Sequence, residues 1–215
     1  MNNGKLENYK EILKLNSIQR EILIGTLLGD VSMPKKNKNK LGFFNPYVKF
    51  EQKIALVEYV EHLYSVFSEW VGTKPAIRNI DLGKLTFRQS VWFKTYSHPS
   101  FLFYYQQFYG SFNEKKTIPL SFIKSLTPRS LAYWYMDDGS FNRRDGTCSL
   151  HTQGFGYSEL NDTMIILAAK YNLLLSLHKD GNKWKLYVKR ESTDVFLTLI
   201  KPYILPCFYY KINIS

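Results

Sequence analysis

Two aspartates stand at matching places in two apolar segments, and a carboxylate pair of this kind is suited to binding a divalent cation. The segment LIGTLLGDV reaches its acid at Asp30, and the segment LAYWYMDDG reaches its acid at Asp138. Both are expected to be helices with small residues on one face, Gly25 and Gly29 in the first and Ala132 in the second, which would allow close packing. An acid at a helix C-terminus meets the negative end of the dipole, and parallel helices would bring the two like charges together. The pair therefore predicts a divalent cation between them.

Each of these segments has a simpler interpretation when it is considered alone. Apolar helices often end beside a glycine, so either segment by itself favours a core helix that stops at a Gly-Asp turn. The two together are more informative, because they match in register and the pattern that follows each of them is repeated. The repetition favours a shared functional role for the two aspartates.

Hydrophobic periodicity predicts two halves, each interpreted as helix, two strands, helix, two strands and a final helix. The elements expected in the first half are a helix at 19–30, a strand at 47–53, a helix at 54–71, strands at 76–80 and 84–92, and a helix at 101–109. Those expected in the second half are a helix at 129–138, strands at 140–144 and 147–153, a helix at 158–171, strands at 173–179 and 183–190, and a helix at 192–200. The predicted domains are 1–110 and 128–215, joined by a connector at 111–127.

The composition favours a folded protein that binds a polyanion. Hydrophobic residues make up 45% of the 215 residues and aromatic residues 16%, which is enough for a sizeable core. The 29 Lys and Arg against 18 Asp and Glu give a net charge of +11, which favours nucleic acid, although a merely basic soluble protein would share it. Two isolated cysteines, Cys148 and Cys207, predict neither a zinc knuckle nor a disulfide framework.

The two apolar segments resemble the paired LAGLIDADG motifs of single-chain homing endonucleases. The second segment matches the family pattern at Leu131, Ala132, Asp138 and Gly139. The first segment departs from the pattern because Val31 stands where the family has its final glycine, a change that keeps the acid and alters the turn after it. The stretches KKTIP, SLAYWYMDDG, LIKPYILP and YYK further resemble the intron-encoded omega endonuclease subgroup, and the resemblance extends over residues 18–211.

This resemblance implies an α+β fold. It would consist of two pseudo-symmetric αββαββα halves, each with a curved four-stranded antiparallel DNA-binding sheet, packed through two parallel LAGLIDADG helices at 23–31 and 131–139. It implies a metal-dependent enzyme that hydrolyses both strands of a long double-stranded DNA target and promotes intron homing. Because one chain carries both motifs, we expect a monomer and a non-palindromic target.

The last acid of each motif binds the catalytic metal ions in that family, so the resemblance implies Asp30 and Asp138 as metal ligands. The backbone carbonyls of Gly29 and Asp137 are further candidates, and the nine-residue register puts Asp138 rather than Asp137 at the catalytic position. The implied cofactor is Mg²⁺, which prefers carboxylate, water and phosphate oxygens. We expect Mn²⁺ to substitute for it and Ca²⁺ to bind without supporting turnover.

The resemblance also implies catalytic residues around the metals. Lys116 and Lys211 match family lysines that border the two active sites, with Lys115 as the alternative to Lys116. A lysine there would stabilise developing charge or polarise water, although any one lysine in so basic a protein is usually a solvated surface charge. His151 and Gln153 are candidates for the rim of the second site, where they would order water. His151 is expected to be a DNA contact or a satisfied surface group rather than a metal ligand.

The strand at 47–53 carries the corresponding candidates for the first half. Alternation places Lys49, Glu51 and Lys53 on one face, and Phe50 with Gln52 on the other. Phe50 has the character of a core residue, so the face with Lys49 should meet DNA. Glu51 is therefore favoured over Gln52 as the active-site residue.

Basic and amide side chains interleave along the predicted strands, where they could pair with base edges in the major groove. We expect about half of these positions to be only solvated. The strand candidates are Lys49, Lys53, Arg78, Asn79, Lys84, Arg88, Asn142, Arg143, Arg144, Lys183, Lys185 and Lys189. Lys35, Lys36, Lys38 and Lys40 lie in a loop expected to bind phosphates.

Two other functions stay open on the sequence. A maturase that assists splicing of its own intron RNA would have the same charge and fold, but it would not need both acids. A non-catalytic DNA-binding protein would be expected to carry a helix-turn-helix or zinc finger, and neither is visible. No run is apolar and long enough to span a bilayer, and the N-terminus has no signal-like stretch. We expect an intracellular protein, in an organelle or a prokaryotic cytoplasm, with the mitochondrion slightly favoured.

Overall fold

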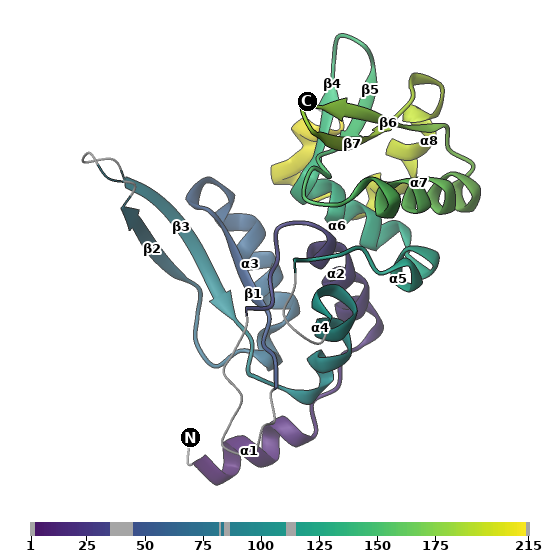
Figure 1. The fold of residues 1–215 in the computed structure, drawn as a ribbon. Coiled ribbons are helices and arrows are strands. Elements are labelled where there is room, and N and C mark those ends of the chain that lie inside the picture. The colour runs from purple at the N-terminus through teal and green to yellow at the C-terminus, as the bar shows by residue number, and fades with distance from the viewer. Residues whose placement is uncertain (1–2, 35–44, 82, 84–86, 111–114, 214–215) are drawn as a thin grey trace. The chain divides into compact units, whose positions relative to one another are not determined.

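A computed structural model describes residues 3–34, 45–81, 83, 87–110 and 115–213. The chain divides into two compact units, unit 1 (Met1–Arg20, Asp30–Gln106) and unit 2 (Glu21–Gly29, Gln107–Ser215). The predicted halves follow chain order, whereas the segment Glu21–Gly29 of the first half belongs to unit 2. Helix α2 (Ser17–Leu28), labelled in Figure 1, begins in unit 1. Its part from Glu21 onward belongs to unit 2.

Unit 1 is built on an antiparallel sheet. It contains β1 (Lys49–Lys53), β2 (Ala76–Asp81) and β3 (Phe87–Lys94), in the order β1-β3-β2. Helix α3 (Val57–Val66) covers one face, where Phe50 and Phe93 stack with ring centroids 4.6 Å apart. The helix predicted at 54–71 is divided, because the turns at η1 (Ile54–Leu56) and η2 (Ser68–Trp70) are 3₁₀ rather than α-helical.

The predicted fourth strand of this sheet does not occur among the described residues. Only Ser32 pairs with Lys49, as an isolated antiparallel bridge beside β1. Residues 35–44, which include the predicted phosphate-binding loop, lie outside the described residues, as does Lys84. The other elements of unit 1 are α1 (Asn3–Glu11), which the sequence did not predict, η3 (Pro99–Phe101) and the start of α4 (Leu102–Tyr109).

Unit 2 contains the predicted four-stranded antiparallel sheet. Its strands are β4 (Gly139–Asn142), β5 (Thr147–Leu150), β6 (Leu175–Asp180) and β7 (Lys183–Val188), in the order β4-β5-β7-β6. The two predicted Asp-Gly hairpin turns are present, with Gly146 at φ 62° and Gly181 at φ 61°. The helices are α5 (Leu120–Ser125), α6 (Pro128–Asp138), α7 (Tyr157–Tyr171) and α8 (Arg190–Ile200), followed by η4 (Lys201–Tyr203) and η5 (Pro206–Lys211).

The α2 segment of unit 2 packs directly against α6. A Cβ on Gly25 would lie 2.2 Å from the carbonyl oxygen of Ser130, and one on Gly29 would lie 2.4 Å from Asp137 Oδ2. Residue numbers rise in the same direction along both helices, so they are parallel, as predicted. Glycine is required at both contacts because any side chain would meet the facing helix. Among the described helices, none has the length and apolar character to cross a membrane.

Candidate active site

The Asp30 carboxylate lies just after the end of α2, in unit 1, within reach of strand β1. Gln52 donates a hydrogen bond from Nε2 to Asp30 Oδ2, at 2.9 Å. A hollow of about 310 Å³, here called the Asp30 hollow, is lined by Asp30, Glu51, Gln52, Arg78, Ile80, Arg88 and Ser90. The preference for Glu51 over Gln52 stays a prediction, because both residues line this hollow and Gln52 donates to the aspartate. The strand register does place Gln52 opposite Val91, as alternation predicts, but β1 is an edge strand and its amide reaches Asp30.

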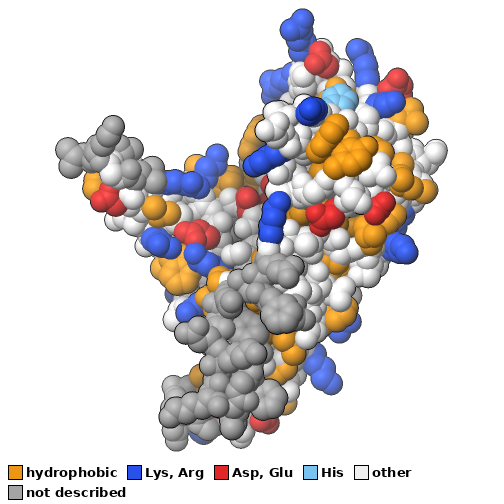
Figure 2. All heavy atoms as spheres, viewed as in Figure 1, with side chains coloured by type: hydrophobic (Ala, Val, Ile, Leu, Met, Phe, Trp, Pro, Cys, Tyr) orange, Lys and Arg blue, Asp and Glu red, His pale blue; other side chains and the backbone are white. Residues whose placement is uncertain are grey.

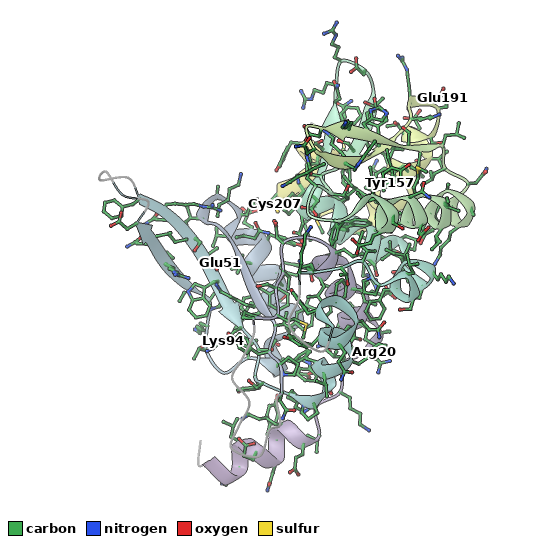
Figure 3. All side chains as sticks on the ribbon, in the orientation of Figure 1. Arg20, Glu51, Lys94, Tyr157, Glu191 and Cys207 are labelled. Atoms are coloured by element: carbon green, nitrogen blue, oxygen red, sulfur yellow. The ribbon has the colours of Figure 1, made fainter. Side chains whose placement is uncertain are left out.

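Glu51 belongs to a small charged network on the same strand. Ser90 donates from Oγ to Glu51 Oε1 at 2.6 Å, and the ammonium group of Lys49 pairs with Glu51 Oε2. Partial burial alone would raise the pKa of Glu51, but the hydrogen bonds from Lys49 and Ser90 and the charges of Lys49 and Arg78 lower it below its usual range. Glu51, labelled in Figure 3, is therefore an ionised side chain that lines the Asp30 hollow.

Asp138 is the last residue of α6, in unit 2. Trp134 donates from Nε1 to Asp138 Oδ2 at 3.3 Å, and the backbone N–H of His151 donates to the Asp138 carbonyl at 2.8 Å. A hollow of about 370 Å³, here called the Asp138 hollow, is lined by Leu28, Gly29, Lys115, Lys116, Asp138, His151, Gly154 and Phe155. The structure thus brings together five of the sequence candidates, namely Gly29, Lys116 with its alternative Lys115, Asp138 and His151.

The two predicted lysines bind the C-terminal carbonyls of the two aspartate-bearing helices. Lys116 donates from Nζ to the Gly29 carbonyl at 2.7 Å. Lys211 donates to the Met136 carbonyl at 2.6 Å and to the Asp137 carbonyl at 3.2 Å. A cation at this end of a helix donates to carbonyls that have no partner within the helix, and it interacts favourably with the negative end of the helix dipole. The carbonyls proposed as extra metal ligands, those of Gly29 and Asp137, are therefore the ones that accept from lysine here.

His151 lies in the Asp138 hollow as a neutral group. Its Nε2 is 3.0 Å from Ser140 Oγ, on the neighbouring strand. Burial lowers the pKa of His151, and the nearby charges of Lys185 and Lys211 lower it further, against the opposing effect of Asp180. At neutral pH the imidazole is therefore uncharged and has one nitrogen able to accept a hydrogen bond.

Gln153 lies elsewhere than predicted. Strand β5 ends at Leu150, and the chain turns after it, so that the Gln153 amide donates to Asp180 Oδ2 at 2.8 Å. Gln153 therefore contacts the end of β6, and its place at the rim of the active site stays a prediction. Periodicity predicted a strand to 153, which is three residues too long.

The sequence matches a known family along most of its length. The model of the LAGLIDADG DNA endonuclease family matches residues 20–196. The chain belongs to this family. The LAGLIDADG motifs are the C-terminal part of α2 with Asp30, and α6 with Asp138.

Individual relatives agree with this assignment. A probable intron-encoded endonuclease of Wickerhamomyces canadensis is 36% identical, over 98% of this chain and 91% of its own length. The solved structure of the homing endonuclease I-WcaI, bound to its DNA recognition sequence, superposes with a TM-score of 0.87 at 32% identity, over 98% of this chain and 92% of the other. A cytochrome b mRNA maturase of Saccharomyces cerevisiae is 28% identical over 98% of this chain, which spans 51% of the maturase. The fold of the chain is thus the LAGLIDADG homing endonuclease fold.

The exposed face of the unit 1 sheet is strongly basic. Residues paired across strands share a face, and the pairs are Lys49 with Lys94, Glu51 with Trp92, Arg78 with Ser90, and Ile80 with Arg88. Lys53 is on this face too, because it pairs with Ser90. Figure 2 shows Lys and Arg side chains along these strands. The predicted candidates Lys49, Lys53, Arg78 and Arg88 therefore lie together.

Asn79 is the exception among the described candidates of unit 1. It pairs with Gln89, and Gln89 Nε2 donates to Asn79 Oδ1 at 3.0 Å. Because successive residues of a strand point to opposite faces, Asn79 faces away from Arg78. Arg78 and Asn79 therefore lie on opposite faces of the sheet, and Asn79 as a DNA contact stays a prediction.

The corresponding face of the unit 2 sheet carries more hydroxyl groups. Ser149 pairs with Ser140 and with Tyr187, and Lys185 pairs with His178 on the same face. Among the predicted candidates, Lys183 and Lys185 are on this face, Arg143 and Arg144 are in the β4–β5 turn, and Lys189 follows β7. Asn142 has its amide in the turn, where Nδ2 donates to Asp145 Oδ2 at 2.6 Å and Oδ1 accepts from the Arg144 N–H.

The donor set fits a divalent ion that takes few protein ligands. Within the described residues, no three His, Cys, Asp or Glu side chains form a group that could hold a metal by themselves. Each motif aspartate offers one carboxylate beside an open hollow, and Mg²⁺ commonly binds through one or two carboxylates with water and substrate phosphate completing its octahedron. A site that closes only with phosphate suits a nuclease better than a structural metal centre.

Proposed function

We propose that this chain is a homing endonuclease that hydrolyses both strands of a long, non-palindromic double-stranded DNA target. The observation that supports it most is the repeated arrangement of an acid and a lysine at the ends of the two motif helices. Asp30 follows the end of α2, where Lys116 donates to the Gly29 carbonyl, and Asp138 is the last residue of α6, where Lys211 donates to the Asp137 carbonyl. The similarity to I-WcaI, which was solved on its DNA recognition sequence, supports the same function.

In this proposal Asp30 and Asp138 are the metal ligands. When bound, Mg²⁺ would lower the pKa of a coordinated water and stabilise negative charge on the phosphate. Mn²⁺ is expected to substitute, and Ca²⁺ to bind without turnover. Gln52 holds the Asp30 carboxylate, and Lys116 and Lys211 place positive charge where the pentacovalent phosphate becomes more negative.

The side chains beside the two hollows have separate roles in this proposal. The neutral His151 imidazole orients water in the Asp138 hollow through its accepting nitrogen. Glu51, with Ser90, does so in the Asp30 hollow. The basic face of unit 1 supplies most of the affinity for the phosphate backbone, because a polyanion binds chiefly through charge.

The basic face allows a prediction for binding. Changing Arg78 to Ala should weaken binding to every DNA sequence and reduce the slope of log affinity against log salt by about one. The measurement is fluorescence anisotropy of a labelled duplex at several salt concentrations, without metal. The charge-matched control is Lys124→Ala, on helix α5, which packs against α7 and not on this face. An Arg78 variant with the slope of wild type would remove Arg78 from the interface.

One experiment tests the proposed function as a whole. The protein is incubated with a randomised double-stranded DNA library and Mg²⁺, and the cut ends are sequenced. A single long asymmetric consensus, cut in both strands by a species that elutes as a monomer, is the expected result. Loss of cutting with EDTA and recovery with Mn²⁺ are expected too. Recovery of cut ends without any shared sequence, or no cutting at all, would refute the proposal.

A second candidate function is RNA binding as a maturase. It is favoured by two relatives named cytochrome b mRNA maturases, which are 28% and 30% identical over 98% and 90% of this chain. Binding to the intron that surrounds its own coding sequence, with acceleration of splicing, would test it. One further relative is named as chloroplastic, and an organelle remains our expected location, the mitochondrion first.

A further inference from the structure

Trp134 has a buried side chain with a single polar group. Its relative exposure is 0%, and it lies one helical turn before Asp138 in α6. The indole N–H can only donate, so a buried indole needs an acceptor inside the protein. The acceptor is the catalytic candidate itself, because Nε1 donates to Asp138 Oδ2 at 3.3 Å.

The first motif has no such donor at the matching place. Matching positions of the two motif helices differ by 108 in residue number. Arg129 binds Glu21, 108 residues earlier, and Asp138 follows Asp30 by the same number. The residue that matches Trp134 is Thr26. Its hydroxyl donates to its own helix, to the carbonyls of Ile22 at 2.9 Å and Leu23 at 3.2 Å.

The two aspartates therefore accept hydrogen bonds from different kinds of donor. Asp138 accepts from the fully buried indole of Trp134, in its own helix. Asp30 is held by the amide of Gln52, which comes from strand β1. A partner whose own rotamer is fixed by packing orients a ligand more firmly than a partially exposed amide does.

We propose that Trp134 is a positioning residue for the Asp138 carboxylate, and that only one of the two strand cleavages depends on it. The proposal rests on the proposed function, in which Asp138 is a metal ligand. The indole N–H fixes the orientation of the carboxylate within α6. Removing that hydrogen bond should affect the strand served by Asp138 and leave the strand served by Asp30 unchanged.

The hydrogen bond itself is tested first, without any DNA or metal. The chain has four tryptophans, so ¹⁵N-labelled indoles give four resonances in the NMR spectrum of the free protein. Trp134→Phe identifies one of them by its loss. Asp138→Asn, which replaces a charged acceptor by a neutral one, should move that resonance upfield, whereas Asp30→Asn should leave it in place. A Trp134 indole resonance whose chemical shift is unchanged by Asp138→Asn would overturn the proposal.

The consequence for cleavage is tested on a supercoiled plasmid that carries the site recovered from the randomised library. Loss of a partner of a metal ligand typically costs about 10- to 100-fold in activity or metal affinity, so Trp134→Phe should accumulate nicked circles and raise the Mg²⁺ concentration for half-maximal cutting of one strand. Its affinity for the site should stay close to that of wild type, whereas its melting temperature should fall, because the smaller ring leaves a cavity in the core. The matched control is Trp184→Phe, at an indole that packs on Tyr157 with ring centroids 4.8 Å apart.

The outcomes separate the two proposals. Equal slowing of both strands by Trp134→Phe, or no slowing of either, would overturn the role given to Trp134. Failure of the wild-type protein to cut any site would refute the proposed function instead. The NMR result would still decide whether the indole holds Asp138.

Discussion

Asp30→Asn and Asp138→Asn, made separately, should each abolish double-strand cleavage while leaving specific DNA binding largely intact. The substitution keeps the shape of the side chain and removes the charge that a divalent ion requires. Loss of metal assistance costs several kcal/mol of transition-state stabilisation, so cleavage of the affected strand should fall on the order of 1,000-fold. Binding should survive because it depends mainly on phosphate contacts made by many cationic side chains.

The measurement is a time course on supercoiled plasmid, which separates intact, nicked and linear DNA, with a gel shift for binding. Asp162→Asn, on helix α7 and outside the residues that line either hollow, is the matched control and should cut like wild type. Full linearisation by either motif variant would show that the aspartate is not a metal ligand. Loss of binding in step with cleavage would show instead that the acid supports the interface.

Gly25→Ala should give the largest loss of stability among single methyl additions at the motif helices. A Cβ at this position would lie 2.2 Å from the Ser130 carbonyl oxygen and 2.9 Å from Tyr133 Cβ, and neither is the end of a flexible side chain. The overpacking should cost about 3 kcal/mol, partly offset by about 1 kcal/mol of better helix propensity. A net loss of about 2 kcal/mol lowers the melting temperature by about 4–8 °C for a chain of this size.

Thermal unfolding followed by circular dichroism measures this effect. The control is Gly154→Ala, because a Cβ there would meet no atom of the described residues within 4 Å. That variant should stay within about 0.5 kcal/mol of wild type. A Gly25 variant as stable as the control would mean that the two helices have room between them, against the close packing described here.

Much of the local structure follows from the sequence alone. The sequence predicts α6 and α7 to within one residue at each end. In α7 the buried residues recur at helical spacing, whereas in α6 the whole run from Ser130 to Met136 is buried. The Asp-Gly pairs predict the turns at Gly146 and Gly181, because a tight hairpin needs a positive φ that glycine tolerates. The motif acids Asp30 and Asp138 stand out for a similar reason, since a repeated unfavourable charge is visible without any structure.

Only the tertiary structure decides which side chains meet at these acids. The bond from Lys116 to Gly29 spans 87 residues, and that from Lys211 to Asp137 spans 74. Alternation assigned Gln52 to the core face, but it cannot say how a side chain at an edge strand turns toward a neighbouring segment. The hydrogen bond from the Trp134 indole to Asp138 could not be predicted either, because a tryptophan in an apolar helix is ordinarily a core residue. Local sequence fixes periodicity and turns through short-range sterics, whereas hydrogen bonds between distant residues depend on how the packed elements meet in space.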